Sequence, residues 1–118
     1  MDPQLKRGLT DACVLALLSR EDSYGYKLVR DAAGLMPLSE STLYPVLRRL
    51  EEAGALGVYS QEHGGRLRRY YRITQQGRQQ LADFAREWEA LGKVYAFIKQ
   101  MEKENQQHLT REENDHEA

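Results

Sequence analysis

The 118 residues suffice for one small domain with some extra length, and 41% of them are hydrophobic, enough for a packed core. The formal net charge of −1 hides an asymmetry: residues 1–101 hold 15 Lys and Arg against 12 Asp and Glu, whereas residues 102–118 hold 2 against 6. The longest apolar run, residues 12–18, is far shorter than the roughly 18 residues of a membrane span, and a single cysteine excludes an internal disulfide. These features predict a cytoplasmic protein with a mildly basic body and an acidic tail.

The first predicted helix covers residues 5–19. Its apolar face is so wide that the helix must be largely buried. Cys13 lies within this face and has two interpretations, a small core residue or a redox-sensing or ligand-sensing thiol. The core interpretation is favoured, because reactive thiols usually need exposure and neighbouring positive charge.

A second helix is predicted over residues 23–33. Asp22 or Ser23 would cap its start, and Gly34 would close it as a C-cap residue. Gly25 lies in the first turn, where the missing Cβ permits another group to approach the backbone closely.

The third predicted helix starts at Ser39 as N-cap, with Leu38 and Leu43 as a hydrophobic staple, and ends at Gly54. It has two unlike faces. One face is apolar, and the other carries hydroxyls, an aromatic ring and a cation but no carboxylate; the apolar face holds Leu43, Val46, Leu47 and Leu50, and the other holds Ser41, Tyr44, Pro45 and Arg48. Such an outer face is able to bond base edges and phosphates in a DNA major groove. An ordinary amphipathic helix with a solvated face is the alternative.

Two short strands, over residues 56–61 and 67–74, are predicted on either side of a turn at His63-Gly64-Gly65. The second strand and its turn carry four cations without an intervening acid: Arg66, Arg68, Arg69 and Arg72. A cationic hairpin beside a hydroxyl-rich helix favours contact with a phosphate backbone. The alternative is charge that protects an edge strand from aggregation.

Thr74 is predicted to cap a long helix over residues 75–104. Its apolar residues alternate spacings of three and four, which is a heptad pattern: Leu81, Phe84, Trp88, Leu91, Tyr95 and Ile98. This stripe exceeds what a small three-helix domain is able to cover, so a two-fold homodimer is expected. The polar, acidic residues 105–118 are expected to be a disordered tail.

Together these elements predict a mainly α fold with a small β-hairpin. A winged helix-turn-helix domain would cover residues 1–74, a dimerisation helix residues 75–104, and a tail residues 105–118. The pattern YGYKL at residues 24–28, STLYPVLRRLEEAGAL at residues 41–56 and GGRLRRYYRITQQG at residues 64–77 resembles the PadR family of bacterial transcriptional regulators. The resemblance covers about residues 5–81, and the single long last helix is similar to the short-tailed branch of that family.

The resemblance implies a homodimer that binds palindromic, double-stranded operator DNA, usually as a repressor. By the same resemblance, the groove-facing residues would be Ser41, Thr42, Tyr44, Pro45 and Arg48. Tyr24 would touch the DNA backbone, and Arg66, Arg68 and Arg69 would lie on the wing. Some members of the short branch hold flat aromatic compounds between paired tryptophans.

Trp88 therefore has two interpretations. As an interface anchor it would fill the centre of the dimer contact. As a pocket wall it would hold two helices apart beside small residues of the first helix, Gly8 and Ala12, so that two indoles stack a planar aromatic effector.

Two rival functions fit parts of the same sequence. A protein-interaction module would use the same winged fold to dock a partner protein, although the arginine-rich wing argues against it. An enzyme is disfavoured because His63, His108 and His116 show neither metal-site spacing nor a pairing with Cys13. No cofactor and no metal are expected.

Overall fold

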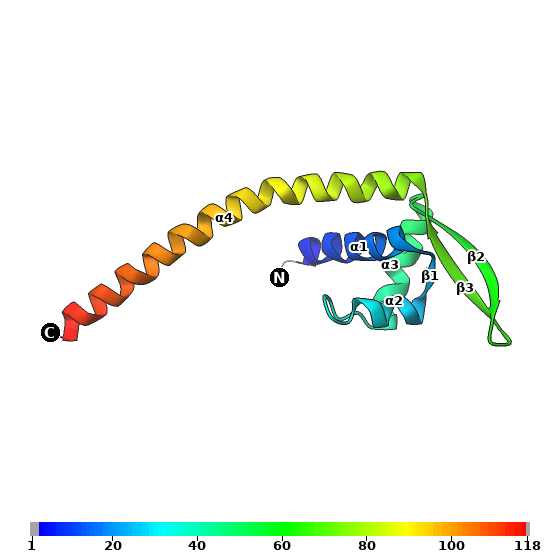
Figure 1. Cartoon of the computed structure of the whole chain (residues 1–118), viewed down its shortest axis with the longest axis horizontal. Helices are drawn as coiled ribbons and strands as arrows, with labels where there is room; N and C mark the ends of the chain where they lie inside the picture. The colour runs from blue at the N-terminus through cyan, green and yellow to red at the C-terminus, as the bar shows by residue number, and fades with distance from the viewer. Residues whose placement is uncertain (1–2, 118) are drawn as a thin grey trace. The chain divides into compact units, whose positions relative to one another are not determined.

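The computed structural model describes residues 3–117, with side chains described for residues 3–113. In chain order the elements are α1 (Pro3–Arg20), β1 (Ser23–Tyr24), α2 (Gly25–Ala32), α3 (Glu40–Glu52), β2 (Leu56–His63), β3 (Arg66–Ile73) and α4 (Gln75–Glu117) (Figure 1). The chain divides into two compact units, with the boundary after Phe84. The predicted fold class, mainly helical with a small antiparallel sheet and a long last helix, is confirmed.

The core of the first unit is built from α1, α2 and α3, with one edge closed by the sheet. Its most fully buried side chains include Leu15 and Leu18 of α1 and Leu43, Leu47 and Leu50 of α3, all exposed by 1% or less. Cys13 packs against this cluster and is half-buried. Burial raises the pKa of its thiol, which keeps it protonated and fits the core interpretation.

The sheet has three strands in the order β1-β3-β2, all antiparallel. Gly64 and Gly65 both have positive φ, 58° and 81°, as a two-residue hairpin turn of type I′ requires. The predicted hairpin is present, but β1 was missed. Ser23 pairs with Tyr71 in the sheet instead of capping a helix, because a two-residue strand is too short to show an alternating pattern.

The ends of α2 correct the predicted caps. Its N-cap residue is Tyr24, which makes no side-chain capping hydrogen bond, so neither Asp22 nor Ser23 has that role. The C-cap residue is Ala33 in right-handed helical geometry, and Gly34 does not adopt the left-handed conformation expected of a C-cap glycine.

The ends of α3 follow the sequence closely. Ser39 is the N-cap residue, and its Oγ accepts a hydrogen bond from the Thr42 backbone N–H at 3.2 Å. At the other end Gly54 has φ 81°, and the N–H groups of Gly54 and Ala55 donate to the carbonyls of Glu51 and Leu50, which is a Schellman motif. Pro45 lies inside the helix on its exposed side, and the helix continues through it.

The last helix, α4, is longer than predicted. Its start is capped by the Thr74 hydroxyl, which accepts from the Gly77 N–H at 3.1 Å. It then runs to Glu117, which corrects the predicted end near Glu104 and the predicted disorder of residues 105–117, whereas residue 118 of that predicted tail lies outside the described residues. The sequence contains neither Gly nor Pro after Gly92, and pairs such as His108–Glu112, one turn apart, support the helix. No helix within residues 3–117 combines the length and apolar character needed to cross a membrane.

The junction between the sheet and α4 depends on the missing side chain of Gly77. A Cβ there would lie 2.3 Å from the Ala55 carbonyl oxygen and 2.8 Å from Ile73 Cγ1. The Ala55 carbonyl also accepts the Thr74 N–H at 3.0 Å, so it is not free to shift. This close approach packs the start of α4 against the connection between α3 and β2.

We therefore expect Gly77→Ala to lower the free energy of unfolding by about 1–3 kcal/mol, the usual cost of forcing extra atoms into a packed site. Gly92→Ala is the matched control in the same helix, because a Cβ at Gly92 meets nothing within 4 Å. The control should be neutral or stabilising by up to about 1 kcal/mol. Urea unfolding followed by circular dichroism measures both, and equal stabilities for the two variants would contradict the proposed close contact.

Candidate nucleic-acid interface

The outer face of α3 presents the side chains that its sequence pattern indicated. Leu43, Val46, Leu47 and Leu50 are buried, whereas the opposite face is exposed and consists of Ser41, Thr42, Tyr44, Pro45 and Arg48. The hydroxyls at the start of this face form a cluster, with Ser39 Oγ 2.9 Å from Ser41 Oγ and 3.0 Å from Thr42 Oγ1. Within the described part of the chain, no side chain pairs with Arg48. The guanidinium is therefore available to an external acceptor.

The Tyr44 ring lies across the N-terminus of α2, directly over Gly25. A Cβ at Gly25 would lie 2.7 Å from the Tyr44 hydroxyl oxygen and 3.0 Å from Cζ, so no side chain fits there while the ring keeps its position. Gly25 is thus the site of the close approach that its place in the sequence suggested, and Tyr44 is the partner. This contact holds the ring of a residue that is still 45% exposed.

Two ion pairs join α3 to neighbouring elements, one to α1 and one to the wing. Arg49 pairs with Asp11 of α1, whose side chain is only 18% exposed. Glu51 pairs with Arg69 of β3, with Oε2 and Nη2 3.1 Å apart. Neither pair was predicted, because each joins residues far apart in the sequence.

On the outer face of the sheet, a ladder-like row of tyrosine rings from neighbouring strands is in contact with arginine guanidinium groups. Tyr59 and Tyr70, on β2 and β3, stack with centroids 5.6 Å apart, and Tyr24 meets Tyr70 edge-on at 5.4 Å. The Arg68 guanidinium lies 4.4 Å from the Tyr24 ring centroid, a cation–π contact. The ladder therefore places Tyr24 and Arg68, which are far apart in the sequence, on one surface.

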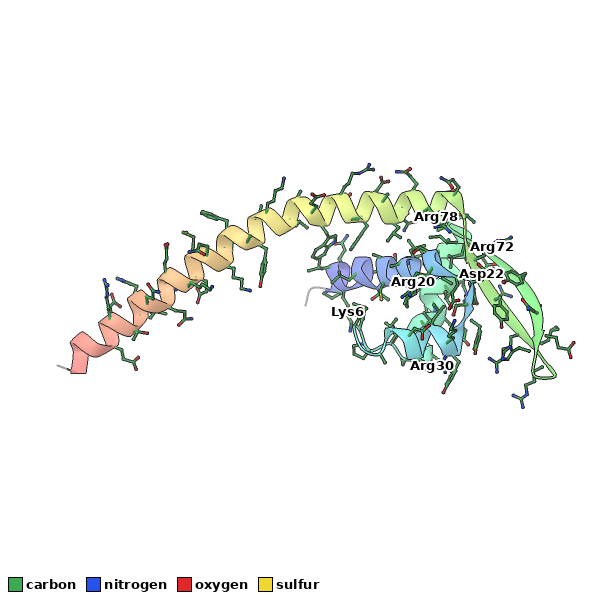
Figure 2. All side chains as sticks on the ribbon, viewed as in Figure 1. Lys6, Arg20, Asp22, Arg30, Arg72 and Arg78 are labelled. Carbon is green, nitrogen blue, oxygen red and sulfur yellow. The ribbon has the colours of Figure 1, made fainter. Side chains whose placement is uncertain are left out.

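Tyr59 anchors the other end of this ladder. Its hydroxyl donates to an Asp22 carboxylate oxygen at 2.6 Å, and this hydrogen bond raises the pKa of Tyr59. The Arg72 guanidinium lies 5.7 Å from the Tyr59 ring centroid. Figure 2 shows Asp22 and Arg72 at the same end of the sheet.

The three predicted wing arginines do not share one environment. Arg66 is exposed beside the hairpin turn, and Arg68 is half-buried on the aromatic face. Arg69 points to the opposite face, where Glu51 neutralises part of its charge. The wing sequence contains no acid beside these arginines and therefore suggested that all of them were unpaired. Arg69 is nevertheless paired, because Glu51 comes from α3.

β1 pairs only with Tyr70 and Tyr71 of β3, so residues 66–69 keep an open strand edge. Protection of this edge from aggregation therefore remains an alternative role for their charge.

A cleft of about 230 Å³ joins the start of α2, the outer face of α3 and the wing. Tyr24, Tyr44, Arg68 and Arg69 all contribute to its walls, together with Gly25 and Tyr26. We call this cleft, with the exposed face of α3 and Arg66, the α3–wing surface. It combines hydroxyls, phenol rings and guanidinium groups, which is the chemistry that bonds phosphate oxygens and base edges.

The residues predicted for dimerisation and ligand binding are divided between the two units. In the first unit, Leu81 packs against the core, and Phe84 lines a small cavity of about 90 Å³ together with Gly8 and Ala12. In the second unit, Trp88 is half-buried, whereas the rest of the stripe is exposed by about half or more: Leu91 by 51%, Tyr95 by 63% and Ile98 by 56%.

Comparison with known proteins identifies a family to which this chain is similar. The sequence profile described as "Transcriptional regulator PadR-like family" matches residues 14–83. A crystal structure from Streptococcus mutans is 41% identical, with a TM-score of 0.69 over 73% of this chain and 81% of the other. A PadR family transcriptional regulator from Eggerthella lenta is 36% identical, with a TM-score of 0.71 over 80% of this chain and 85% of the other.

The fold is also that of Bacillus subtilis PadR, whose crystal structure is a complex with operator DNA. That protein is 22% identical, with a TM-score of 0.61 over 65% of this chain and 46% of the other. At this identity the likeness concerns the fold alone. The family match covers more than half of the chain and both parts of the α3–wing surface. The chain belongs to the PadR-like family of transcriptional regulators and is a regulator rather than an enzyme.

Proposed function

We propose that the chain binds double-stranded operator DNA through the α3–wing surface, with α3 in the major groove and the wing against the phosphate backbone. The observation that carries this proposal is the exposed face of α3 between Ser41 and Arg48, which presents hydroxyls, a phenol ring and a guanidinium group, with Tyr44 held over Gly25. Ser41, Thr42, Tyr44, Pro45 and Arg48 face the groove, whereas Tyr24, Arg66 and Arg68 contact phosphates. That a protein with this fold was crystallised on operator DNA supports the proposal. A protein-docking module is the alternative function.

Arg69 has a smaller role in this proposal than the sequence suggested. Its guanidinium already bonds Glu51, and a phosphate would have to compete with that carboxylate. Arg68 instead lies over the Tyr24 ring, which limits its motion without neutralising its charge. We therefore assign the strongest wing contacts to Arg66 and Arg68.

The contact between Gly25 and Tyr44 tests the role of α3. Gly25→Ala should displace the Tyr44 ring and lower affinity for an operator selected from a random DNA pool. In a Tyr44→Ala background the same change should cost little, because the clashing ring is absent. The double-mutant cycle should give a coupling of about 0.5–3 kcal/mol, as contacting residues do.

Gly34→Ala is the matched control for this cycle, since a Cβ at Gly34 meets nothing within 4 Å. It should leave operator affinity unchanged. Fluorescence anisotropy with labelled operator and with a scrambled duplex measures all variants. Additive effects of Gly25→Ala and Tyr44→Ala, or equal losses on both duplexes, would remove Tyr44 from sequence reading.

We further propose that the chain is a homodimer formed through α4 and that its operator is palindromic. The support is the apolar stripe of the second unit, whose side chains are exposed in the single chain although they are large and apolar: Leu91, Val94, Tyr95, Phe97, Ile98 and Met101. Pairing two copies would bury this stripe and set two recognition helices roughly 34–36 Å apart, one turn of DNA. In this arrangement the protein acts in the cytoplasm as a repressor that blocks a promoter.

The exposed stripe makes a direct prediction about assembly. Leu91→Asp or Ile98→Asp should convert the dimer to a monomer and abolish tight operator binding, because each change buries a carboxylate at the interface. Gln100→Asp adds the same charge to the same helix outside the stripe and should leave the dimer intact. Sedimentation equilibrium at micromolar concentration measures the mass, and a monomeric wild-type chain would contradict the proposal.

We also propose that a small planar aromatic effector binds at Trp88 and releases the DNA. Gly8 and Ala12 line a cavity of the first unit that does not include Trp88 and measures only about 90 Å³, far below the roughly 300 Å³ of a usual ligand pocket. A second copy would therefore have to contribute to the site. The interface-anchor interpretation of Trp88 remains the alternative.

Trp88 is the only tryptophan, so its fluorescence reports on this site directly. Planar aromatic dyes should quench it by stacking on the indole. Their binding, measured by calorimetry, should be lost in Trp88→Ala while sedimentation still shows a dimer. If a panel of such dyes leaves the emission unchanged, Trp88 is an interface anchor and the effector proposal fails.

A further inference from the structure

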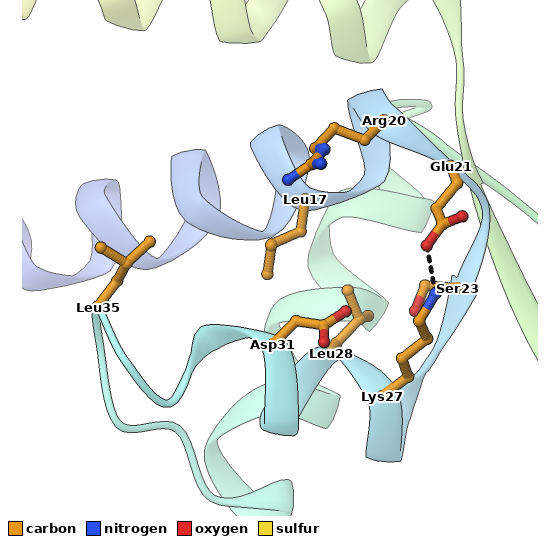
Figure 3. Close-up of a pocket in the computed structure, with 8 residues that line it drawn as sticks. All are labelled: Leu17, Arg20, Glu21, Ser23, Lys27, Leu28, Asp31 and Leu35. Atoms are coloured by element: carbon orange, nitrogen blue, oxygen red, sulfur yellow. Dashed lines mark hydrogen bonds and ion pairs between the residues drawn. The ribbon is translucent and has the colours of Figure 1, made fainter.

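A larger cavity lies in the first unit, between the C-terminal end of α1 and α2 (Figure 3). Its volume is about 560 Å³, within the range of about 300–1,000 Å³ for small-molecule sites. Leu17 and Leu28 form an apolar floor, and Leu35 is 82% exposed at the rim. None of the residues assigned to the α3–wing surface lines this cavity. The proposed DNA contact therefore does not explain the side chains that line it.

Four charged side chains surround this floor, but only two of them are paired. Lys27 and Glu21 form an ion pair, drawn as a dashed line in Figure 3. The remaining two are Arg20, at the end of α1, and Asp31, on α2. Figure 3 shows Arg20 lying along α1 and Asp31 on α2, with Leu17 reaching from α1 into the space between the two helices. Neither forms a hydrogen bond or an ion pair with any residue that the structure describes, although Arg20 interacts at longer range with the charge of Glu21, and Asp31 with that of Lys27.

A buried hydroxyl also lines the cavity without a partner. Ser23 is only 3% exposed, and its Oγ is the one buried side-chain polar atom in the described part of the chain that has no hydrogen bond. Buried polar groups are almost always hydrogen-bonded, so such an exception calls for an explanation. A polar ligand atom in the cavity would supply the missing partner.

We propose that this pocket binds a small zwitterion, an α-amino acid with an apolar side chain. Arg20 pairs with the carboxylate and Asp31 with the ammonium group. The side chain of the ligand covers Leu17, Leu28 and Leu35, and the Ser23 hydroxyl bonds a polar atom of the ligand. A simple anion would leave Asp31 unpaired, and a simple cation would leave Arg20 unpaired. A zwitterion satisfies both charges at once.

The test uses the full-length chain without DNA, so its outcome does not depend on the proposed DNA-binding function. The probes are L-leucine, L-valine, L-methionine and L-phenylalanine, titrated while backbone amide resonances of residues 17–35 are followed by NMR. At least one probe should give saturable shifts confined to this region. For leucine, 4-methylpentanoate lacks the ammonium group and 3-methylbutylamine lacks the carboxylate, so each should bind about tenfold more weakly or worse.

Arg20→Gln and Asp31→Asn should each weaken binding of the responding amino acid by about tenfold or more. Arg30→Gln is the matched control, because Arg30 is an exposed arginine of α2 that does not line the cavity (Figure 2). Ser23→Ala should leave the fold intact, since its hydroxyl has no partner to lose, and should weaken binding. The proposal is overturned if no probe gives saturable shifts, if the three leucine-related compounds bind equally, or if Arg20→Gln and Arg30→Gln behave alike.

Discussion

Burial of the leucine face of α3 is the constraint on which the rest of the α3–wing surface depends. Leu43, Leu47 and Leu50 are exposed by 1% or less, and a helix that buries one face must present the opposite one. That geometry alone decides that Tyr44 and Arg48 face outward. The ion pairs with Asp11 and Arg69 then fix the helix against α1 and β3.

Local signals in the sequence predicted the ends of α3 and the hairpin turn well, but not the ends of α2. Ser39 as N-cap, Gly54 as the residue after the end of α3, and Gly64-Gly65 as a tight turn were all identified correctly, because each depends on the backbone preferences of a single residue or a short run. The two-residue strand β1 was missed for the opposite reason. It exists only because Ser23 and Tyr24 pair with Tyr71 and Tyr70, which are nearly fifty residues later in the chain.

The difference between local signals and contacts of distant residues also explains which features of the site could be predicted. Helical spacing was sufficient to place Ser41, Tyr44 and Arg48 on one face. Spacing was insufficient to show that Tyr44 packs on Gly25 or that Arg68 lies over the Tyr24 ring. It also could not show that Glu51 forms an ion pair with Arg69. These contacts depend on how separate elements pack. The unpaired charges of Arg20 and Asp31 likewise became visible only once α1 and α2 were placed side by side.

We propose above all that the α3–wing surface holds DNA and that Arg66 and Arg68 of the wing carry part of its charge. The most direct measurement is the dependence of DNA affinity on salt, because each lost phosphate contact reduces the slope of log K against log salt concentration by about one. We expect the double variant Arg66→Ala and Arg68→Ala to bind every duplex more weakly, with a slope lower by about two. The control variant Arg111→Ala, an exposed arginine of α4, should retain the wild-type affinity and slope. An unchanged slope in the double variant, or an equal loss in the control, would contradict the account.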